Sequence, residues 1–122
     1  MDKKLTKQQH KILKEKGTEM PFTSKFLREK GNGNYHCVNC NALLFNSEDK
    51  FDSETGWPSF TNAKNVELIS DNSLFIQRTE VICKSCGGHL GHVFDDGPHG
   101  KKRYCINGCI LNFKKLKGGT EK

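Results

Sequence analysis

The hydrophobic residues of this chain fall in short stretches that are separated by turn residues. Near the N-terminus, Leu5, Ile12 and Leu13 recur at helical spacing among lysines, which predicts an amphipathic helix within residues 1–16. From residue 35 onward, apolar residues gather in short segments that are typical of β-strands. We therefore expect a mainly β protein with helical structure on its N-terminal side.

The predicted strands are bounded by glycine, asparagine, aspartate and proline, which favour turns. Strands are expected at residues 35–37, 42–45, 66–71, 74–79, 80–83, 92–94, 103–107 and 111–114. Residues 71–73 suit a hairpin turn between two of these strands. A short helix is expected after Thr23, because Pro21 interrupts the regular backbone before it. Together these elements predict a small antiparallel β domain.

Length and charge narrow the class of protein. A chain of 122 residues allows one domain, and 34% hydrophobic residues allow only a modest core. The net charge of +6 comes largely from lysines near the two ends, which are usually solvated, so it does not require a nucleic acid as partner. No apolar run approaches the roughly 20 residues that span a bilayer, and no secretory signal is visible. We expect a cytoplasmic protein that binds neither nucleic acid nor membranes.

Four of the six cysteines form two CxxC pairs. The pairs are Cys37 with Cys40 and Cys83 with Cys86. In the reducing cytosol such cysteines bind metals or react more often than they form disulfides. Four thiolates suit tetrahedral Zn²⁺, and a closed shell of sulfur leaves no open position for water or substrate. We predict one structural zinc ion; iron at this site and a redox dithiol at one CxxC pair are the alternatives.

The other two cysteines lie in a segment that is rich in polar, chemically active residues. Cys105 is two residues after Arg103, and His89 and His92 precede it closely in sequence. A nearby cation favours the thiolate form of cysteine, and histidine can supply a proton near neutral pH. Cys105 is therefore a candidate nucleophile, with a buried structural cysteine as the alternative.

A third motif surrounds the single tryptophan. Trp57 lies between Gly56 and Pro58, where neither a helix nor a regular strand is expected. An indole ring fixed on a loop makes a good wall for an apolar group of a ligand. Ordinary packing into the core is the alternative interpretation.

Together these segments resemble the methionine sulfoxide reductase B family. The matching segments are GTEMPF (17–22), YHCVNCNALLF (35–45), KFDSETGWPSF (50–60), VICKSCGGHLGHVFDDGP (81–98) and RYCIN (103–107). The resemblance covers residues 17–113, which we expect to form the catalytic domain, with residues 1–16 as a helical or frayed extension and 114–122 as a basic tail. It implies two antiparallel sheets in an open barrel with helices at the N-terminal side, and the four CxxC cysteines match the zinc-binding members of the family. We expect a monomer in which the zinc ion staples the fold.

The resemblance also implies a reaction. Members of this family reduce the R epimer of methionine sulfoxide in proteins, which repairs oxidative damage. Cys105 would attack the sulfoxide sulfur and become a sulfenic acid, while His89 or His92 protonates the leaving oxygen. The further roles that it implies are support of the thiolate by Arg103, ordering of the imidazoles by Asn107 and Asp96, and substrate contact by Trp57 and Phe60.

The chain departs from the family pattern at one position. Many members carry a resolving cysteine directly before GWPSF, and this chain has Thr55 there. Cys109 is a possible substitute, although four residues of extended strand cover about 13 Å and disulfide Cα atoms lie within about 7 Å. Gly108 would have to bend the strand. The alternative is direct reduction of the sulfenic acid by thioredoxin or another thiol reductant.

Two other classes of protein use some of these features. A zinc-ribbon module that binds nucleic acid would explain the four CxxC cysteines and the basic ends, but it leaves the GWPSF, HLGHVF and RYCIN motifs unexplained. A non-catalytic zinc-stapled binding protein would be expected to lack Cys105 and the histidines, which are present here. The motifs therefore favour the reductase.

Overall fold

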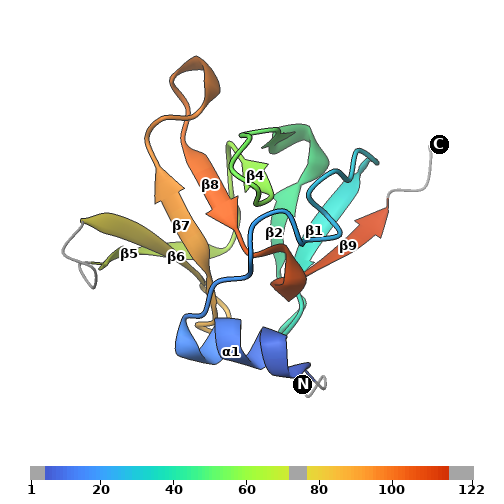
Figure 1. The fold of residues 1–122 in the computed structure, drawn as a ribbon, viewed down its shortest axis with the longest axis vertical. Helices are drawn as coiled ribbons and strands as arrows, with labels where there is room; N and C mark the ends of the chain where they lie inside the picture. Colours follow the sequence, from blue (N-terminus) through green and yellow to red (C-terminus); the bar gives the residue numbers. More distant parts are fainter. Residues whose placement is uncertain (1–4, 72–76, 116–122) are drawn as a thin grey trace.

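Two antiparallel sheets and a helix make up the structure. The computed structural model describes residues 5–71 and 77–115, and within these ranges the chain forms nine strands and one α-helix (Figure 1). The α-helix is α1 (Lys7–Glu15), and the strands are β1 (Gly33–Cys37), β2 (Leu43–Asn46), β3 (Lys50–Phe51), β4 (Ser59–Phe60), β5 (Val66–Asp71), β6 (Arg78–Cys83), β7 (His89–Phe94), β8 (Arg103–Ile106) and β9 (Leu111–Lys115). Short 3-10 turns are η1 (Ser47–Asp49), η2 (Pro98–Gly100) and η3 (Gly108–Ile110).

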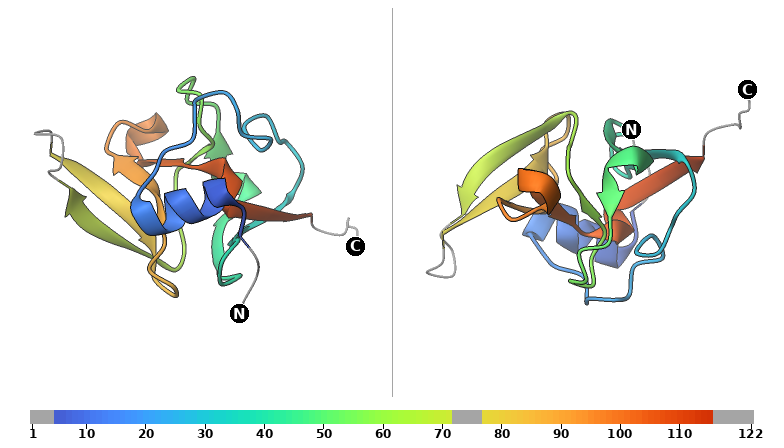
Figure 2. Two further views of the ribbon diagram at one scale, coloured as in Figure 1. Left: turned by 60° about the horizontal axis from the view of Figure 1, so that its bottom comes forward. Right: turned by 90° about the horizontal axis from the view of Figure 1, so that it is seen from above.

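The two sheets differ in size and in how they are assembled. The smaller sheet has the order β2-β1-β9, and the larger has the order β3-β4-β8-β7-β6-β5. The last strand, β9, returns to pair with the first, β1, whereas β4 pairs with β8 across a long stretch of sequence. Figure 2 shows the long β5–β6 pair projecting from one side, with the smaller sheet on the other.

Aromatic rings fill the space between the sheets. Tyr35 of β1, Phe45 of β2 and Phe60 of β4 are almost completely buried. The Phe45 and Phe60 rings stack with centroids 4.3 Å apart, and Tyr35 meets Phe60 edge-on at 5.2 Å. Burial of each such side chain contributes about 1.5–3 kcal/mol to stability. This cluster holds β4, and hence its neighbour β8, against the smaller sheet.

Helix α1 lies across one end of both sheets (Figures 1 and 2). It begins with a capping box, in which Thr6 and Gln9 exchange backbone-to-side-chain hydrogen bonds. Its buried residues Ile12 and Leu13 pack the helix against β7 and η3. The helix ends at Glu15, and Lys16 adopts a left-handed backbone with φ 58°. In residues 5–71 and 77–115, no helix is both long and apolar enough to cross a membrane.

The observed elements confirm the predicted fold class and correct several details. The prediction of a short helix after Thr23 is wrong. Residues 25–28 form turns, and the Leu27 N–H donates a hydrogen bond to the Ser24 carbonyl. Where strands were predicted at 74–79 and 80–83, residues 78–83 form the single strand β6, and residues 74–76 lie outside the described residues. Strands β3 and β4 were not predicted, because two residues give no periodic pattern. The predicted hairpin turn at 71–73 falls largely outside the described residues.

Candidate active site and metal centre

Two similar turns carry the CxxC cysteines. The first begins at Cys37, the last residue of β1, and the second at Cys83, the last residue of β6. The N–H of Asn41 donates to the Cys37 carbonyl at 2.8 Å, and the N–H of Gly87 donates to the Cys83 carbonyl at 2.7 Å. Asn41 and Gly87 both adopt a left-handed backbone, which asparagine and glycine tolerate better than other residues. The residue after each CxxC motif thus lets the chain turn back.

The two turns bring four sulfur atoms together. The Sγ atoms of Cys37, Cys40, Cys83 and Cys86 all lie within 4.8 Å of one another, with 3.8 Å between Cys37 and Cys86 and 3.5 Å between Cys40 and Cys83. A tetrahedron with metal–sulfur bonds of about 2.3 Å has edges of about 3.8 Å, so this donor set can hold one metal ion. A hydrogen bond from the Cys37 thiol lowers the pKa of Cys83 to about 5. The same hydrogen bond and burial raise the pKa of Cys37, and burial raises that of Cys40, so these thiols have to give up their protons when a metal binds.

Strands β7 and β8 place the two histidines beside Cys105. His92 and Cys105 are directly paired across these strands. His89 is on the same strand as His92, and their rings lie 5.5 Å apart. A Cβ atom at Gly91 would collide with the backbone carbonyl of Cys105, so only glycine permits this close approach of the strands. The HLGHVF and RYCIN motifs thus meet as neighbouring strands.

A cavity of about 120 Å³ lies next to Cys105. Its lining includes Trp57, Arg78, His89, His92, Cys105 and Asn107. The cavity is smaller than the roughly 300–1,000 Å³ that is typical of sites for whole ligands. It therefore suits the end of a single side chain better than a free organic cofactor.

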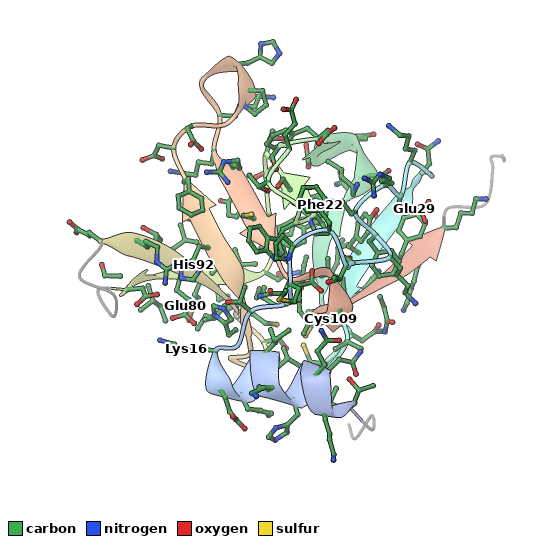
Figure 3. The ribbon with its side chains drawn as sticks, in the orientation of Figure 1. Lys16, Phe22, Glu29, Glu80, His92 and Cys109 are labelled. Carbon is green, nitrogen blue, oxygen red and sulfur yellow. The ribbon has the colours of Figure 1, made fainter. Side chains whose placement is uncertain are left out.

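A buried carboxylate orients His89. Nδ1 of His89 lies 2.7 Å from Oε2 of Glu80, and both side chains are at most 4% exposed. An ionised carboxylate only accepts hydrogen bonds, so His89 donates through Nδ1 and keeps Nε2 for other contacts. Lys16, at the end of α1, contacts the other oxygen of Glu80 at 3.1 Å (Figure 3). Burial lowers the pKa of His89, and the bond to Glu80 opposes this shift.

His92 has a carboxylate partner of its own. Its Nε2 atom lies 2.9 Å from Oδ2 of Asp71, the last residue of β5. Arg78, the first residue of β6, contacts the same oxygen at 3.3 Å. The two imidazoles therefore use opposite ring nitrogens for their carboxylates, Nδ1 in His89 and Nε2 in His92. Each ring is held in a defined orientation from the larger sheet.

Arg103 and Asp96 form a pair next to this site. Nε of Arg103 donates to Asp96 at 2.7 Å, and a second nitrogen donates to the other carboxylate oxygen at 3.2 Å. The guanidinium group also lies 4.3 Å from the centre of the Phe94 ring and interacts with the Cys105 thiol. The Asp96 carboxylate raises the pKa of Arg103, so a permanent positive charge stands near the candidate nucleophile.

The N-terminal segment fixes Trp57 and Asn107 through Glu19. The Trp57 indole N–H donates to the Glu19 carbonyl at 2.9 Å, and the Glu19 N–H donates to Oδ1 of Asn107 at 2.9 Å. The buried Glu19 carboxylate accepts from the backbone N–H groups of Gly108 and Cys109 at 2.7 and 3.2 Å. Burial raises the pKa of Glu19 in spite of these bonds. One acidic residue thus anchors the indole wall and the turn that follows Cys105.

Four of the predicted catalytic, substrate and resolving residues do not line the cavity: Arg103 and Asp96, which pair next to it, and Phe60 and Cys109. Phe60 is fully buried and stacks on Phe45, so the structure places it in the core. Cys109 lies in η3 beside α1, where Gln9 donates to its carbonyl at 2.9 Å (Figure 3). The chain turns at η3, so the span of an extended strand does not apply there. Burial and the Glu19 carboxylate raise the pKa of Cys109 to about 12.

The carboxylates that contact the histidines were not among the predicted site residues. Glu80 and Asp71 are 3% and 8% exposed, which is unusual for acidic residues. Asp96, which was predicted to order the imidazoles, contacts Arg103 through its carboxylate. The sequence does contain one indication, because Glu80 is an acidic residue inside the mainly apolar strand segment TEVIC. Its partner His89 becomes evident only from the pairing of β6 with β7.

Comparison with known proteins shows the family to which the chain belongs. Residues 5–115 match the SelR domain family. Peptide methionine sulfoxide reductase MsrB of Methanosarcina barkeri is 48% identical over 98% of this chain and 87% of its own length. The protein of the same name from Leptospira interrogans is 47% identical over 93% of this chain and 89% of its own length. Human methionine-R-sulfoxide reductase B2, mitochondrial, is 48% identical over 94% of this chain and 69% of its own length. The chain therefore belongs to the SelR domain family, the family of the methionine sulfoxide reductases B.

Proposed function

We propose that this protein reduces the R epimer of methionine sulfoxide in proteins, with Cys105 as the nucleophile. The observation that carries the proposal is the cavity in which the Cys105 thiol, two carboxylate-bound histidines and the Trp57 indole converge. The names of the relatives support the substrate: those from Methanosarcina and Leptospira are peptide methionine sulfoxide reductases, and the human relative is a methionine-R-sulfoxide reductase.

The reaction begins with attack of the Cys105 sulfur on the sulfoxide sulfur. Oxygen is a poor leaving group until it is protonated, so an imidazolium ion of His89 or His92 supplies a proton as the S–O bond weakens. The protonated oxygen then passes from the substrate sulfur to the Cys105 sulfur as the bond between the two sulfur atoms breaks, which releases methionine and leaves Cys105 as a sulfenic acid. In balance, a sulfoxide and a thiol give a thioether and a sulfenic acid.

The other residues bind the substrate, stabilise the thiolate and fix the backbone near the histidines. Trp57 forms an apolar wall for the methyl group of the substrate, because Glu19 holds its indole N–H at 2.9 Å. Arg103 stabilises the Cys105 thiolate, and Asp96 holds the guanidinium group in place. Asn107, which donates to the Leu90 carbonyl at 3.0 Å, fixes the backbone between the two histidines.

The metal in the four-cysteine cluster is proposed to be one structural zinc ion. Cys37, Cys40, Cys83 and Cys86 would hold it, and four sulfur ligands leave no position for substrate. The four cysteines lie at the end of β1 in one sheet and at the end of β6 in the other, so an ion held by them would stabilise the fold. It would also fix the cysteine turn that leads into β7, the strand that carries both histidines.

Regeneration of Cys105 requires a thiol reductant. A resolving cysteine reacts as a thiolate, and the pKa of Cys109, raised to about 12, keeps this residue protonated at neutral pH. We therefore favour direct reduction by thioredoxin or a small thiol: two thiols and the sulfenic acid give the Cys105 thiol, a disulfide and water. The monomeric state, the cytoplasmic location and the division of the chain at residues 16 and 113 stay predictions from the sequence.

The decisive experiment uses separate peptides that carry R- or S-methionine sulfoxide. The purified protein is incubated with each peptide and dithiothreitol, and methionine formation is followed by chromatography. We expect turnover of the R epimer only, with no turnover by a Cys105→Ser variant that retains its metal and its fold. Failure to reduce the R epimer in a folded, metal-loaded protein would refute the proposed function.

A further inference from the structure

A row of hydroxyl groups leads to the Cys105 sulfur from the side opposite the histidine strand β7. Oγ1 of Thr55 lies 3.6 Å from the Cys105 Sγ atom, within hydrogen-bond range for sulfur. Oγ of Ser53 lies 2.7 Å from the Thr55 hydroxyl and 2.7 Å from the Ser59 hydroxyl. Ser59 then donates to the backbone carbonyl of Trp57 at 3.1 Å. The row thus connects the candidate nucleophile to the backbone of the indole wall.

Proton counting fixes the direction of every hydrogen bond in this row. Each hydroxyl group has one proton to donate. Because Ser59 donates to the Trp57 carbonyl, Ser53 must donate to Ser59, and Thr55 must donate to Ser53. Thr55 can then only accept a hydrogen bond from Cys105, which requires the protonated thiol. With the Ser59 proton on the Trp57 carbonyl, the row therefore suits the thiol form of Cys105.

A thiolate requires the opposite direction. It has no proton and accepts hydrogen bonds, so Thr55 must donate to sulfur, Ser53 to Thr55 and Ser59 to Ser53. The Trp57 carbonyl then loses the Ser59 proton. This reversal exchanges one neutral hydrogen bond at the buried end of the row for a charge-assisted bond at the sulfur, and charge-assisted bonds are the stronger class.

We propose that Thr55, Ser53 and Ser59 form a reversible hydroxyl relay in which Thr55 donates a hydrogen bond to the Cys105 thiolate. The inference rests on the proposed role of Cys105 as nucleophile. It assigns Thr55 a role for which its hydroxyl is needed, at the position where the resemblance places a resolving cysteine. Ser59 then acts as a lock, by which we mean that its hydrogen bond to the Trp57 carbonyl holds the row in the direction suited to the thiol.

Other charged groups face Cys105 and must be separated from this effect. Arg103 is on the same strand as Cys105, and His92 is paired with Cys105 across β7 and β8. His89 and Arg78 line the same cavity as Cys105. Substitutions in the hydroxyl row leave all four in place. A change in Cys105 reactivity on removal of one hydroxyl group therefore reports the row itself.

The test measures alkylation of Cys105 by iodoacetamide against pH in the full-length, metal-loaded protein. Every variant also carries Cys109→Ser, so the tryptic peptide 104–114 contains a single cysteine for mass spectrometry. Thr55→Val keeps the shape and removes the hydroxyl group, and it should move the midpoint of the curve up by about one pH unit. Thr55→Ser should restore it. Ser59→Ala removes the lock and should move the midpoint down.

Thr61→Val is the matched control, because the Thr61 hydroxyl bonds to the Asp49 carbonyl and not to the row. It should leave the curve unchanged, and thermal unfolding with metal analysis confirms that each variant is folded. The relay is wrong if Thr55→Val alkylates like the parent protein, or if Ser59→Ala moves the midpoint up as far as Thr55→Val. Alkylation needs no sulfoxide, so either result leaves the R-epimer assay as an independent test of the proposed function.

Discussion

Cysteine has two different environments in this protein. In the metal cluster, four thiol groups surround one another, and the sulfur atoms lie within 4.8 Å. Around Cys105, the neighbours are a hydroxyl group at 3.6 Å, a guanidinium group and two histidines. The first set can satisfy a metal ion completely, whereas the second leaves the sulfur open to a cavity. The neighbours of a cysteine, and not the residue type, thus separate a structural role from a reactive one.

The two regions are nevertheless connected. The second CxxC turn joins β6 to β7, and these strands carry Glu80 and the two histidines respectively. Figure 3 shows Glu80 and His92 on the larger sheet, beside Lys16 at the end of α1. A metal ion bound by the four cysteines would therefore fix the geometry of the reactive site without taking part in the proposed chemistry. Variants of the two regions should separate stability from activity.

The largest expected effect is on activity, at Cys105. Cys105→Ser removes the nucleophile, and turnover of R-methionine sulfoxide should fall by at least about 1,000-fold. Metal content and the thermal unfolding midpoint should stay within experimental error of the parent protein. A Cys105→Ser variant with normal turnover would show that the cavity is not the active site.

The largest effect on stability is expected at Cys37. Cys37→Ser removes a metal ligand from a buried cluster, and metal binding contributes about 10 kcal/mol to folding in small zinc domains. We expect loss of the bound metal, measured by mass spectrometry, and a lower free energy of unfolding by several kcal/mol. Cys109→Ser is the matched control, since it removes a thiol outside the cluster. Full metal retention in Cys37→Ser would contradict the assigned ligand set.

A smaller effect, on pH dependence, is expected at Glu80. The Glu80 carboxylate raises the pKa of His89 against the larger, opposing effect of burial. Glu80→Gln removes this charge, so the pKa of His89 falls further and less imidazolium is present at any given pH. If His89 is the acid, the pH–rate profile should move about one unit towards lower pH. An unchanged profile would assign the acid to His92.

The smallest effect is expected at Cys109. With its pKa raised to about 12 by burial and Glu19, this thiol contributes little to resolution of the sulfenic acid. Cys109→Ser should keep turnover with dithiothreitol within about twofold of the parent rate. In the parent protein, mass spectrometry after one equivalent of substrate should show a sulfenic acid at Cys105. A disulfide between Cys105 and Cys109 would restore the resolving role that the sequence allows.

Local patterns were enough to predict much of the molecule. The amphipathic spacing of Ile12 and Leu13 predicted the N-terminal helix, and both residues are buried. The strand at Val66–Asp71 was predicted with its observed bounds. The two CxxC motifs identified the four-cysteine cluster, because each motif brings two thiols together on one turn. Such features depend on residues close in sequence, and the sequence displays them directly.

The tertiary structure decided the contacts between strands that are far apart in the chain. Pairing of β6 with β7 gives His89 its carboxylate, and pairing of β4 with β8 brings Ser59 opposite Cys105. Packing between the sheets places Phe60 in the core, where it stacks on Phe45, although it was predicted to contact the substrate. The sequence determined which reactive groups are present. Strand register decided which of them touch, because a shift of one residue turns every side chain to the other face of the sheet.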